Sequence, residues 1–241
     1  MEDMATVLGK KKDVKKYGQK AEALKKAIND NFWVEEDGYY ASYLYGRQNL
    51  TRTQQSETLG ESFCVLFGIA DEERAAKVIS SMPVGEFGPP IFSPQIVSQP
   101  DYHNNGVWPY VTSFWGKAAA KVGNETALMH ALACNVRTAS IYATNYENYS
   151  FNTGNPYTTQ INSPNMLWGL SGFMGLFHRT FFGLEFTKEG LALKPFIPTV
   201  LAGTRKLEAF PYRGMKLDIT VSGSGNEIAS CLVDGKEAEA F

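Results

Sequence analysis

Two polar and aromatic segments carry the residue types that could do chemistry. One runs over residues 99–119 (QPDYHNNGVWPYVTSFWGKAA) and the other over residues 144–169 (TNYENYSFNTGNPYTTQINSPNMLWG). Their amide groups can make paired hydrogen bonds to neighbouring hydroxyls, and their aromatic rings offer flat apolar faces. This combination is typical of a site for a polyhydroxylated ligand such as a sugar.

Two candidate carboxylates, Asp101 and Glu147, lie in these segments, and a third, Glu57, lies upstream of them. Glu147 is flanked by Tyr146 and Asn148, which could orient its carboxylate, although a surface glutamate would look the same from position alone. Glu57 begins a predicted helix, where it could point into a central cavity or simply interact with the helix dipole. Asp101 could equally cap the turn ahead of Tyr102.

Four motifs, in this order, resemble a known group of glycosidases. They are Tyr102 followed by Val107-Trp108-Pro109, then Glu147-Asn148-Tyr149, then Tyr157-Thr158-Thr159-Gln160, and last Trp168 in the next helix. The order and spacing are similar to those of the clan that contains processing α-glucosidases, mannosylglycerate hydrolases and trehalases. The resemblance covers nearly the whole chain.

The resemblance implies a fold, an activity and a set of site residues. The fold would be mainly α: the C-terminal part of an (α/α)6 toroid followed by a small antiparallel β module. The activity would be inverting hydrolysis of oligosaccharides, with α-glucosides as the leading expectation and Glu147 as the general base that activates water. The residues expected to contact sugar are Tyr102, His103, Asn104, Trp108, Tyr149, Tyr157, Gln160 and Glu57.

Some of these assignments have competing interpretations. The clan often has Arg at the position of Asn104 and Trp at that of His103, so the sugar and its linkage stay open. Trp108 suits a sugar platform or a core residue at a helix start, and Trp168 suits the core better. His103 has no second ligand at a usual metal-site spacing, so neither a metal nor a cofactor is predicted.

The general acid of the clan is an Asp upstream of the region matching Val14–Phe32, and we expect it outside this sequence. Two other classes therefore remain open. A glycoside phosphorylase would use phosphate in place of the base and water, and a non-catalytic carbohydrate-binding remnant would bind sugar without cleaving it.

Apolar periodicity predicts the elements that would position these residues. Spacings of three and four predict a helix over Val14–Phe32, and Asp37-Gly38 between aromatic runs predicts a hairpin. Further helices are expected over residues 56–68 with Ser56 as N-cap, 71–82, 109–123, 124–143 with Asn124 as N-cap, and 165–182, the last one nearly all apolar and expected to be buried.

After residue 186 the pattern changes to short alternating runs broken by Gly and Pro, which predict antiparallel strands. We therefore expect a partial catalytic domain over residues 1–186 and a C-terminal β module, apparently truncated, over residues 187–241. A toroid needs twelve helices and about six are predicted. We expect the missing N-terminal half, or a partner chain, to complete it.

Composition narrows the possible partners. The net charge of -2 gives no basic face, so no nucleic acid is expected. The sequence contains no run of 18 apolar residues, so it predicts no membrane-spanning helix. The three cysteines are too few and too far apart for a disulfide framework. The cellular location stays open.

Overall fold

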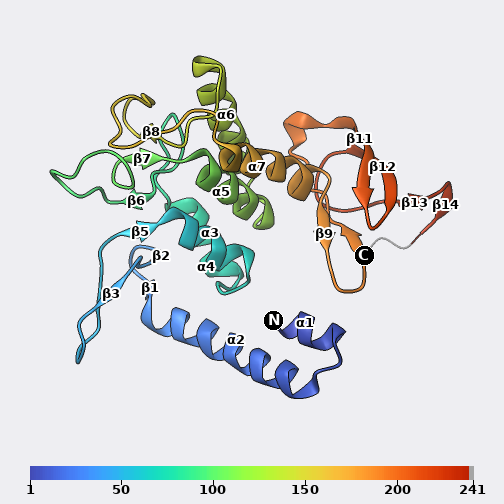
Figure 1. Cartoon of the computed structure of the whole chain (residues 1–241), viewed down its shortest axis with the longest axis horizontal. Coiled ribbons are helices and arrows are strands. Elements are labelled where there is room, and N and C mark those ends of the chain that lie inside the picture. Colours follow the sequence, from blue (N-terminus) through green and yellow to red (C-terminus); the bar gives the residue numbers. More distant parts are fainter. Residues whose placement is uncertain (239–241) are drawn as a thin grey trace.

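A computed structural model describes residues 1–238 of the chain, and the last three residues of the predicted β module, 239–241, lie outside the described part. Within it the chain folds into seven α-helices and a set of small two-stranded antiparallel sheets (Figure 1). The helices are α1 (Glu2–Val7), α2 (Lys11–Asn31), α3 (Thr58–Leu66), α4 (Glu72–Ser81), α5 (Pro109–Lys121), α6 (Glu125–Tyr142) and α7 (Leu167–Leu176).

Within residues 1–238, each of the fourteen strands pairs with a single other strand. The pairs are β1 (Trp33–Val34) with β2 (Tyr39–Tyr40), β3 (Leu44–Tyr45) with β4 (Thr51–Arg52), β5 (Ser56–Glu57) with β6 (Phe92–Ser93), β7 (Gly106–Val107) with β8 (Tyr149–Ser150), β9 (Leu184–Phe186) with β10 (Leu191–Leu193), β11 (Gly203–Tyr212) with β12 (Met215–Gly223), and β13 (Leu232–Val233) with β14 (Lys236–Glu237).

Helix α5 lies at the centre of the helical part, between α3, α6 and α7. Trp115 and Ala118 lie on the buried face of α5, and Leu128 and Ala131 lie on the buried face of α6. All four residues are at most 2% exposed. Alanines on both helices allow the two backbones to approach closely. This packing anchors the two ends of α5, and therefore the loop that leads into its N-terminus.

Several predicted boundaries are confirmed because a side-chain cap fixes them. The Asp71 carboxylate accepts a hydrogen bond from Arg74 N at the start of α4, and Asn124 accepts one from Ala127 N at the start of α6. The hairpin at Asp37-Gly38 is also present, as β1 and β2.

Ser56 is not the N-cap of α3, and this prediction is wrong. Ser56 lies in an extended segment that pairs with Ser93, so its backbone is already committed to a strand. Glu57 is the N-cap instead, and its carboxylate accepts hydrogen bonds from Leu59 N and Gly60 N.

The helix expected over residues 165–182 is shorter and less buried than predicted. α7 ends at Leu176 and continues as a turn of π-helix over Phe177–Phe181. Its buried face consists of Gly169, Gly172 and Leu176, whereas Leu167 is 78% exposed. An apolar sequence alone does not distinguish a helix buried all round from one with an uncovered apolar face.

Helix α2 begins three residues before the predicted Val14 and ends one before Phe32, and it packs poorly. No residue of α2 is buried, and Leu24 on its apolar stripe is 62% exposed.

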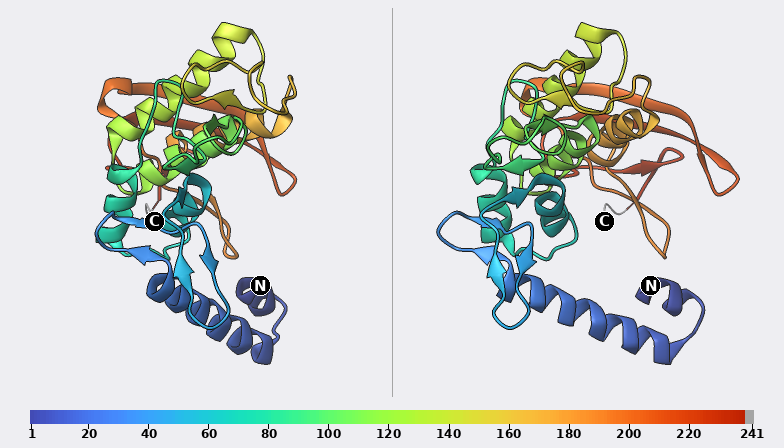
Figure 2. Two further views of the ribbon diagram at one scale, coloured as in Figure 1. Left: turned by 90° about the vertical axis from the view of Figure 1, so that its left-hand side faces the viewer. Right: turned by 60° about the vertical axis from the view of Figure 1, so that its left-hand side comes forward.

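Helix α1, which the sequence analysis did not predict, folds back beside α2 (Figures 1 and 2). The C-terminal end of α2 contacts the helices that follow it, where Ile28 packs on their core and Asn29 accepts a hydrogen bond from Arg74 of α4 at 2.8 Å. A cavity of about 610 Å³ lies between α1 and the tip of the β9–β10 hairpin, where Asp3 pairs with Lys188 at 3.5 Å.

The C-terminal part contains the predicted antiparallel strands. Its longest pair, β11 with β12, forms a two-stranded ribbon on the opposite side of the molecule from the polar loops (Figure 1). The β9–β10 hairpin crosses residue 186, since Phe186 pairs with Leu191. A domain boundary between residues 186 and 187 would cut through this hairpin. The division into a catalytic domain and a β module remains a proposal. No helix in residues 1–238 is long and apolar enough to cross a membrane.

Candidate active site

A short ladder joins the two polar segments. Strand β7 pairs with β8, so that Gly106 lies opposite Ser150 and Val107 opposite Tyr149. The amide of Phe151 extends the contact by donating to the Asn105 carbonyl at 2.8 Å. Glu147 comes two residues before β8, so this ladder brings Glu147 close to residues 102–108 of the first polar segment.

A tight turn shapes the first segment. The Tyr102 carbonyl accepts a hydrogen bond from Trp108 Nε1 at 3.0 Å, which folds residues 102–108 back on themselves. Gly106 makes this possible, because a Cβ atom there would lie 1.8 Å from the Tyr102 carbonyl oxygen. The turn holds the side chains of Tyr102, His103 and Trp108 together.

These rings form an aromatic cluster at the N-terminal ends of α5 and α7. His103 stacks on Trp108 with 5.0 Å between ring centroids and a 22° interplanar angle, and Tyr102 lies 4.6 Å from His103. Trp168 at the start of α7 meets Trp108 edge-on at 5.3 Å. Trp108 is buried, His103 is exposed, and Tyr102 and Trp168 are half-buried. The cluster thus has a buried base and an accessible rim.

Glu57 reaches the same cluster from α3. Strand β5 pairs Glu57 with Phe92, whose ring centroid lies 6.3 Å from that of His103. Burial raises the pKa of the Glu57 carboxyl, although the hydrogen bonds from Gly60 N and Leu59 N and the nearby His103 oppose that rise. Glu57 thus caps α3, which is one of the two interpretations of its position in the sequence; its place in a sugar site stays a prediction.

Glu147 also lies near the cluster. It is half-buried, and its backbone amide donates to the Ser163 carbonyl at 3.0 Å. Burial and, after it, the charge of Glu147 raise the pKa of the Tyr102 phenol. Glu147 therefore lies near Tyr102, and Glu57 lies near His103.

The residues after Glu147 hold its loop in shape. Tyr149 is fully buried, and its hydroxyl accepts a hydrogen bond from Tyr146 N at 3.2 Å. Asn148 is also fully buried and donates to the Ile161 carbonyl at 3.0 Å. Both side chains support the backbone on either side of Glu147.

The other three predicted sugar contacts differ in how far their side chains are engaged by protein. The Asn104 amide accepts from Ile96 N and donates to the carbonyls of Ile96 and Gln99, so it braces its own loop. Tyr157 is 72% exposed and bonds through its hydroxyl to that of Tyr146 at 3.1 Å. Gln160 is exposed, and its backbone amide donates to the Asp101 carbonyl at 2.7 Å.

Two residues of this region escaped the sequence analysis. Phe92 contacts His103 only because β5 and β6 pair across the intervening sequence, and no local pattern signals that pairing. Asn162 donates to the carbonyls of Asn148 and Pro156 at 2.7 and 2.8 Å, and so ties both ends of the second loop together. Its place in an Asn- and Pro-rich loop was the only available signal. Among residues 1–238, no group of three or more His, Cys, Asp or Glu side chains could hold a metal ion.

Comparison with known proteins identifies the class of protein. Residues 1–169 match the family model of the mannosylglycerate hydrolase MGH1-like glycoside hydrolase domain. The chain therefore belongs to this glycoside hydrolase family, whose members adopt the (α/α)6 fold. The resemblance on which the sequence analysis rested is thereby confirmed. No curated protein matches the chain.

Proposed function

We propose that the chain supplies the general base and much of the sugar-binding surface of an inverting glycosidase acting on α-linked oligosaccharides. Its family membership makes a carbohydrate the substrate. The observation that carries the proposal further is the β7–β8 ladder, which brings Glu147 beside Tyr102 and its neighbours.

Glu147 is the general base in this proposal. Its carboxylate takes a proton from water, and that water attacks the anomeric carbon on the face opposite the leaving oxygen. The buried side chains of Tyr149 and Asn148 hold the backbone that carries this carboxylate. Such positioning is what a general base requires.

The aromatic cluster and Glu57 hold the sugar. The exposed imidazole of His103 on Trp108 offers a flat face to a sugar ring, and Tyr102 adds a phenol at its edge. Glu57 accepts hydrogen bonds from two backbone amides, and its carboxylate oxygens retain capacity for a substrate hydroxyl. Asn104 acts indirectly by bracing the loop.

The general acid comes from outside this sequence, together with the helices that complete the toroid. Seven α-helices are present in residues 1–238, and a toroid needs twelve. The missing helices would cover the exposed apolar side chains of α2 and α7. They are encoded either in the same reading frame or in a partner chain.

The test is hydrolysis by this chain joined to its completing helices, comparing wild type with Glu147→Gln. We expect turnover of an α-linked oligosaccharide to fall about a thousandfold in the variant, because the amide cannot take a proton from water. Glu36→Gln, an exposed glutamate on the β1–β2 turn, is the matched control and should keep wild-type turnover. Undiminished turnover in Glu147→Gln, or turnover that requires phosphate, would contradict the proposal.

A further inference from the structure

The hairpin of β3 and β4 projects from the body on the same side as the polar loops (Figures 1 and 2). Tyr43 and Tyr45 are two residues apart in an extended segment, so their side chains lie on one face. Their rings are stacked side by side, with centroids 6.5 Å apart and an interplanar angle of 19°. Tyr43 is 61% exposed and Tyr45 is 50% exposed. The hairpin thus presents two nearly parallel aromatic faces to solvent.

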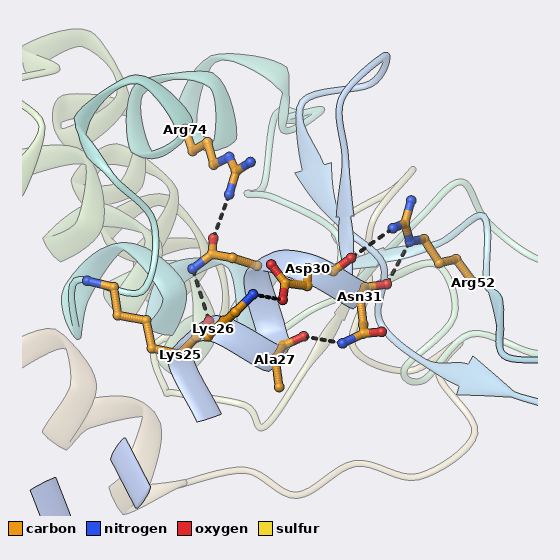
Figure 3. A network of polar contacts seen from close by, with 8 residues as sticks. Lys25, Lys26, Ala27, Asp30, Asn31, Arg52 and Arg74 are labelled. Atoms are coloured by element: carbon orange, nitrogen blue, oxygen red, sulfur yellow. Dashed lines mark hydrogen bonds and ion pairs between the residues drawn. The ribbon is translucent and has the colours of Figure 1, made fainter. Parts of the chain in front are cut away.

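The base of the hairpin is held in place. Arg52 Nε donates to the Asn31 carbonyl at 2.6 Å, and its Nη2 donates to the Asp30 carbonyl at 3.3 Å, which fastens the hairpin to the C-terminal end of α2 (Figure 3). The Thr53 amide donates to the Tyr43 carbonyl at 2.9 Å. These bonds hold the backbone beneath the two rings, so a ligand meets a surface that is already formed.

The other face of the hairpin differs in character. Leu44, between the two tyrosines, points to the opposite side, where it lines a cavity of about 370 Å³ with Leu50 and Arg52. The aliphatic side chain therefore has protein neighbours, whereas the two large aromatic rings are left in solvent. Paired exposed aromatics with polar tips are typical of binding surfaces.

The hairpin is continuous with the proposed active site. Its second strand runs through Gln55, whose carbonyl accepts from the Ser42 amide at 2.8 Å, to Ser56, which is bridged to Ala41. The next residue is Glu57, at the edge of the aromatic cluster. A chain of sugar units extending from Glu57 could follow this strand outward.

We propose that Tyr43 and Tyr45 form an accessory binding platform for pyranose units of an oligosaccharide, outside the cluster at Glu57 and Glu147. The apolar C–H face of a pyranose ring packs on a phenol ring, and the phenol hydroxyls can bond to its equatorial hydroxyls. The inference rests on the proposed carbohydrate substrate but does not depend on Glu147 being the base. The hairpin would therefore bind long substrates only, because a disaccharide bound at Glu57 would not reach the two tyrosines.

The experiment is titration of the chain joined to its completing helices, followed by calorimetry and saturation-transfer NMR. The ligands are α-linked gluco- and manno-hexasaccharides and the corresponding disaccharides, with sulfur in place of the glycosidic oxygens so that they are not hydrolysed. We expect Tyr43→Ala/Tyr45→Ala to weaken hexasaccharide binding at least fivefold and to leave disaccharide binding unchanged. Tyr43→Phe/Tyr45→Phe should keep most of the affinity, because the stacking faces remain. Thermal melting should not change in either variant, since both rings are exposed.

Three results would overturn the inference. They are equal hexasaccharide affinity in wild type and the alanine variant, no binding of any hexasaccharide by wild type, and an alanine variant that changes only the oligomeric state. The last result would identify the hairpin as a protein interface. Glu36→Gln, on the exposed β1–β2 turn, is titrated in parallel and should bind the hexasaccharide as wild type does. Failure of the base assignment, which is measured by turnover, is therefore distinct from failure of the platform, which is measured by binding.

Discussion

Glu57 is the N-cap of α3 and lies next to the aromatic cluster. Its carboxylate accepts hydrogen bonds from Leu59 N and Gly60 N. The backbone of Glu57 pairs with Phe92, whose ring contacts His103. A position at a helix start was visible in the sequence. Its place in the aromatic cluster was not, because that depends on the pairing of β5 with β6.

Glu61, one turn further along α3, is the most unusual carboxyl group of the helical part. It is 1% exposed, and its Oε1 accepts a hydrogen bond from the Tyr40 amide at 2.6 Å. Burial raises its pKa well above the ordinary 4.5, with Glu57 adding to the rise and the Tyr40 amide opposing it. The folded chain therefore keeps Glu61 protonated at pH values where the unfolded chain has released that proton.

This difference predicts a pH-dependent stability. As pH rises above 4.5, the unfolded state binds fewer protons than the folded state, so the free energy of unfolding should fall. Glu61→Gln keeps an acceptor for Tyr40 N but cannot ionise. We expect its advantage over wild type in urea unfolding to grow as the pH rises above 5. Parallel stability profiles for the two proteins would contradict this.

Glu61→Leu provides the control for the hydrogen bond. It removes the acceptor and leaves the buried Tyr40 amide unpaired. We expect it to lose about 1–3 kcal/mol even at pH 5, where Glu61→Gln and wild type should be close in stability.

At the scale of elements, capped helices were the most predictable feature. Asp71 and Asn124 mark the starts of α4 and α6 because their side chains bond within the first turn, which is a local interaction. Ser56 also has a side chain that can cap a helix, yet its backbone pairs with Ser93, 37 residues away in the sequence. The ladders β5–β6 and β7–β8 are two residues long and have no periodic signature, so the sequence could not predict the site that they assemble.

The β7–β8 ladder should be sensitive to one glycine. In Gly106→Ala, the new Cβ atom would meet the Tyr102 carbonyl, a backbone atom that cannot turn away. We expect a loss of about 3 kcal/mol in the free energy of unfolding, together with weaker sugar binding, because the turn at Tyr102 must open.

Gly190→Ala is the matched control for this substitution. An added Cβ at Gly190 has no heavy atom within 4 Å, so the change should stay within about 0.5 kcal/mol of wild type. Similar melting curves and similar disaccharide affinities for Gly106→Ala and wild type would show that the turn does not hold the site.

At the scale of the whole molecule, the described part leaves apolar helix faces uncovered. Leu170 and Met174 on α7 are 40% and 46% exposed, and Phe67 after α3 is 71% exposed. On α5, Lys117 lies 4.2 Å from the centroid of the Phe114 ring, and its burial, together with nearby Arg179, lowers its pKa to about 8. Sequence periodicity predicted these helices, but it could not tell what covers them.

We expect the chain on its own to bind a hydrophobic dye and to self-associate at micromolar concentration. The double variant Leu170→Lys/Met174→Lys should reduce both effects, because it places charges on the uncovered face of α7. Val233→Lys, on a strand of the C-terminal part, should leave both unchanged. Addition of the completing helices should suppress dye binding in wild type. A monomeric wild-type chain that binds no dye would contradict the toroid-completion proposal.

The most direct test of the central claim is anomer-resolved proton NMR of oligosaccharide digestion by the chain joined to its completing helices, with wild type and Glu147→Gln compared. The account predicts that an α-linked substrate yields the β-anomer first and that Glu147→Gln abolishes the signal. Release of the α-anomer first, or continued release by Glu147→Gln, would show that Glu147 is not the base of an inverting reaction.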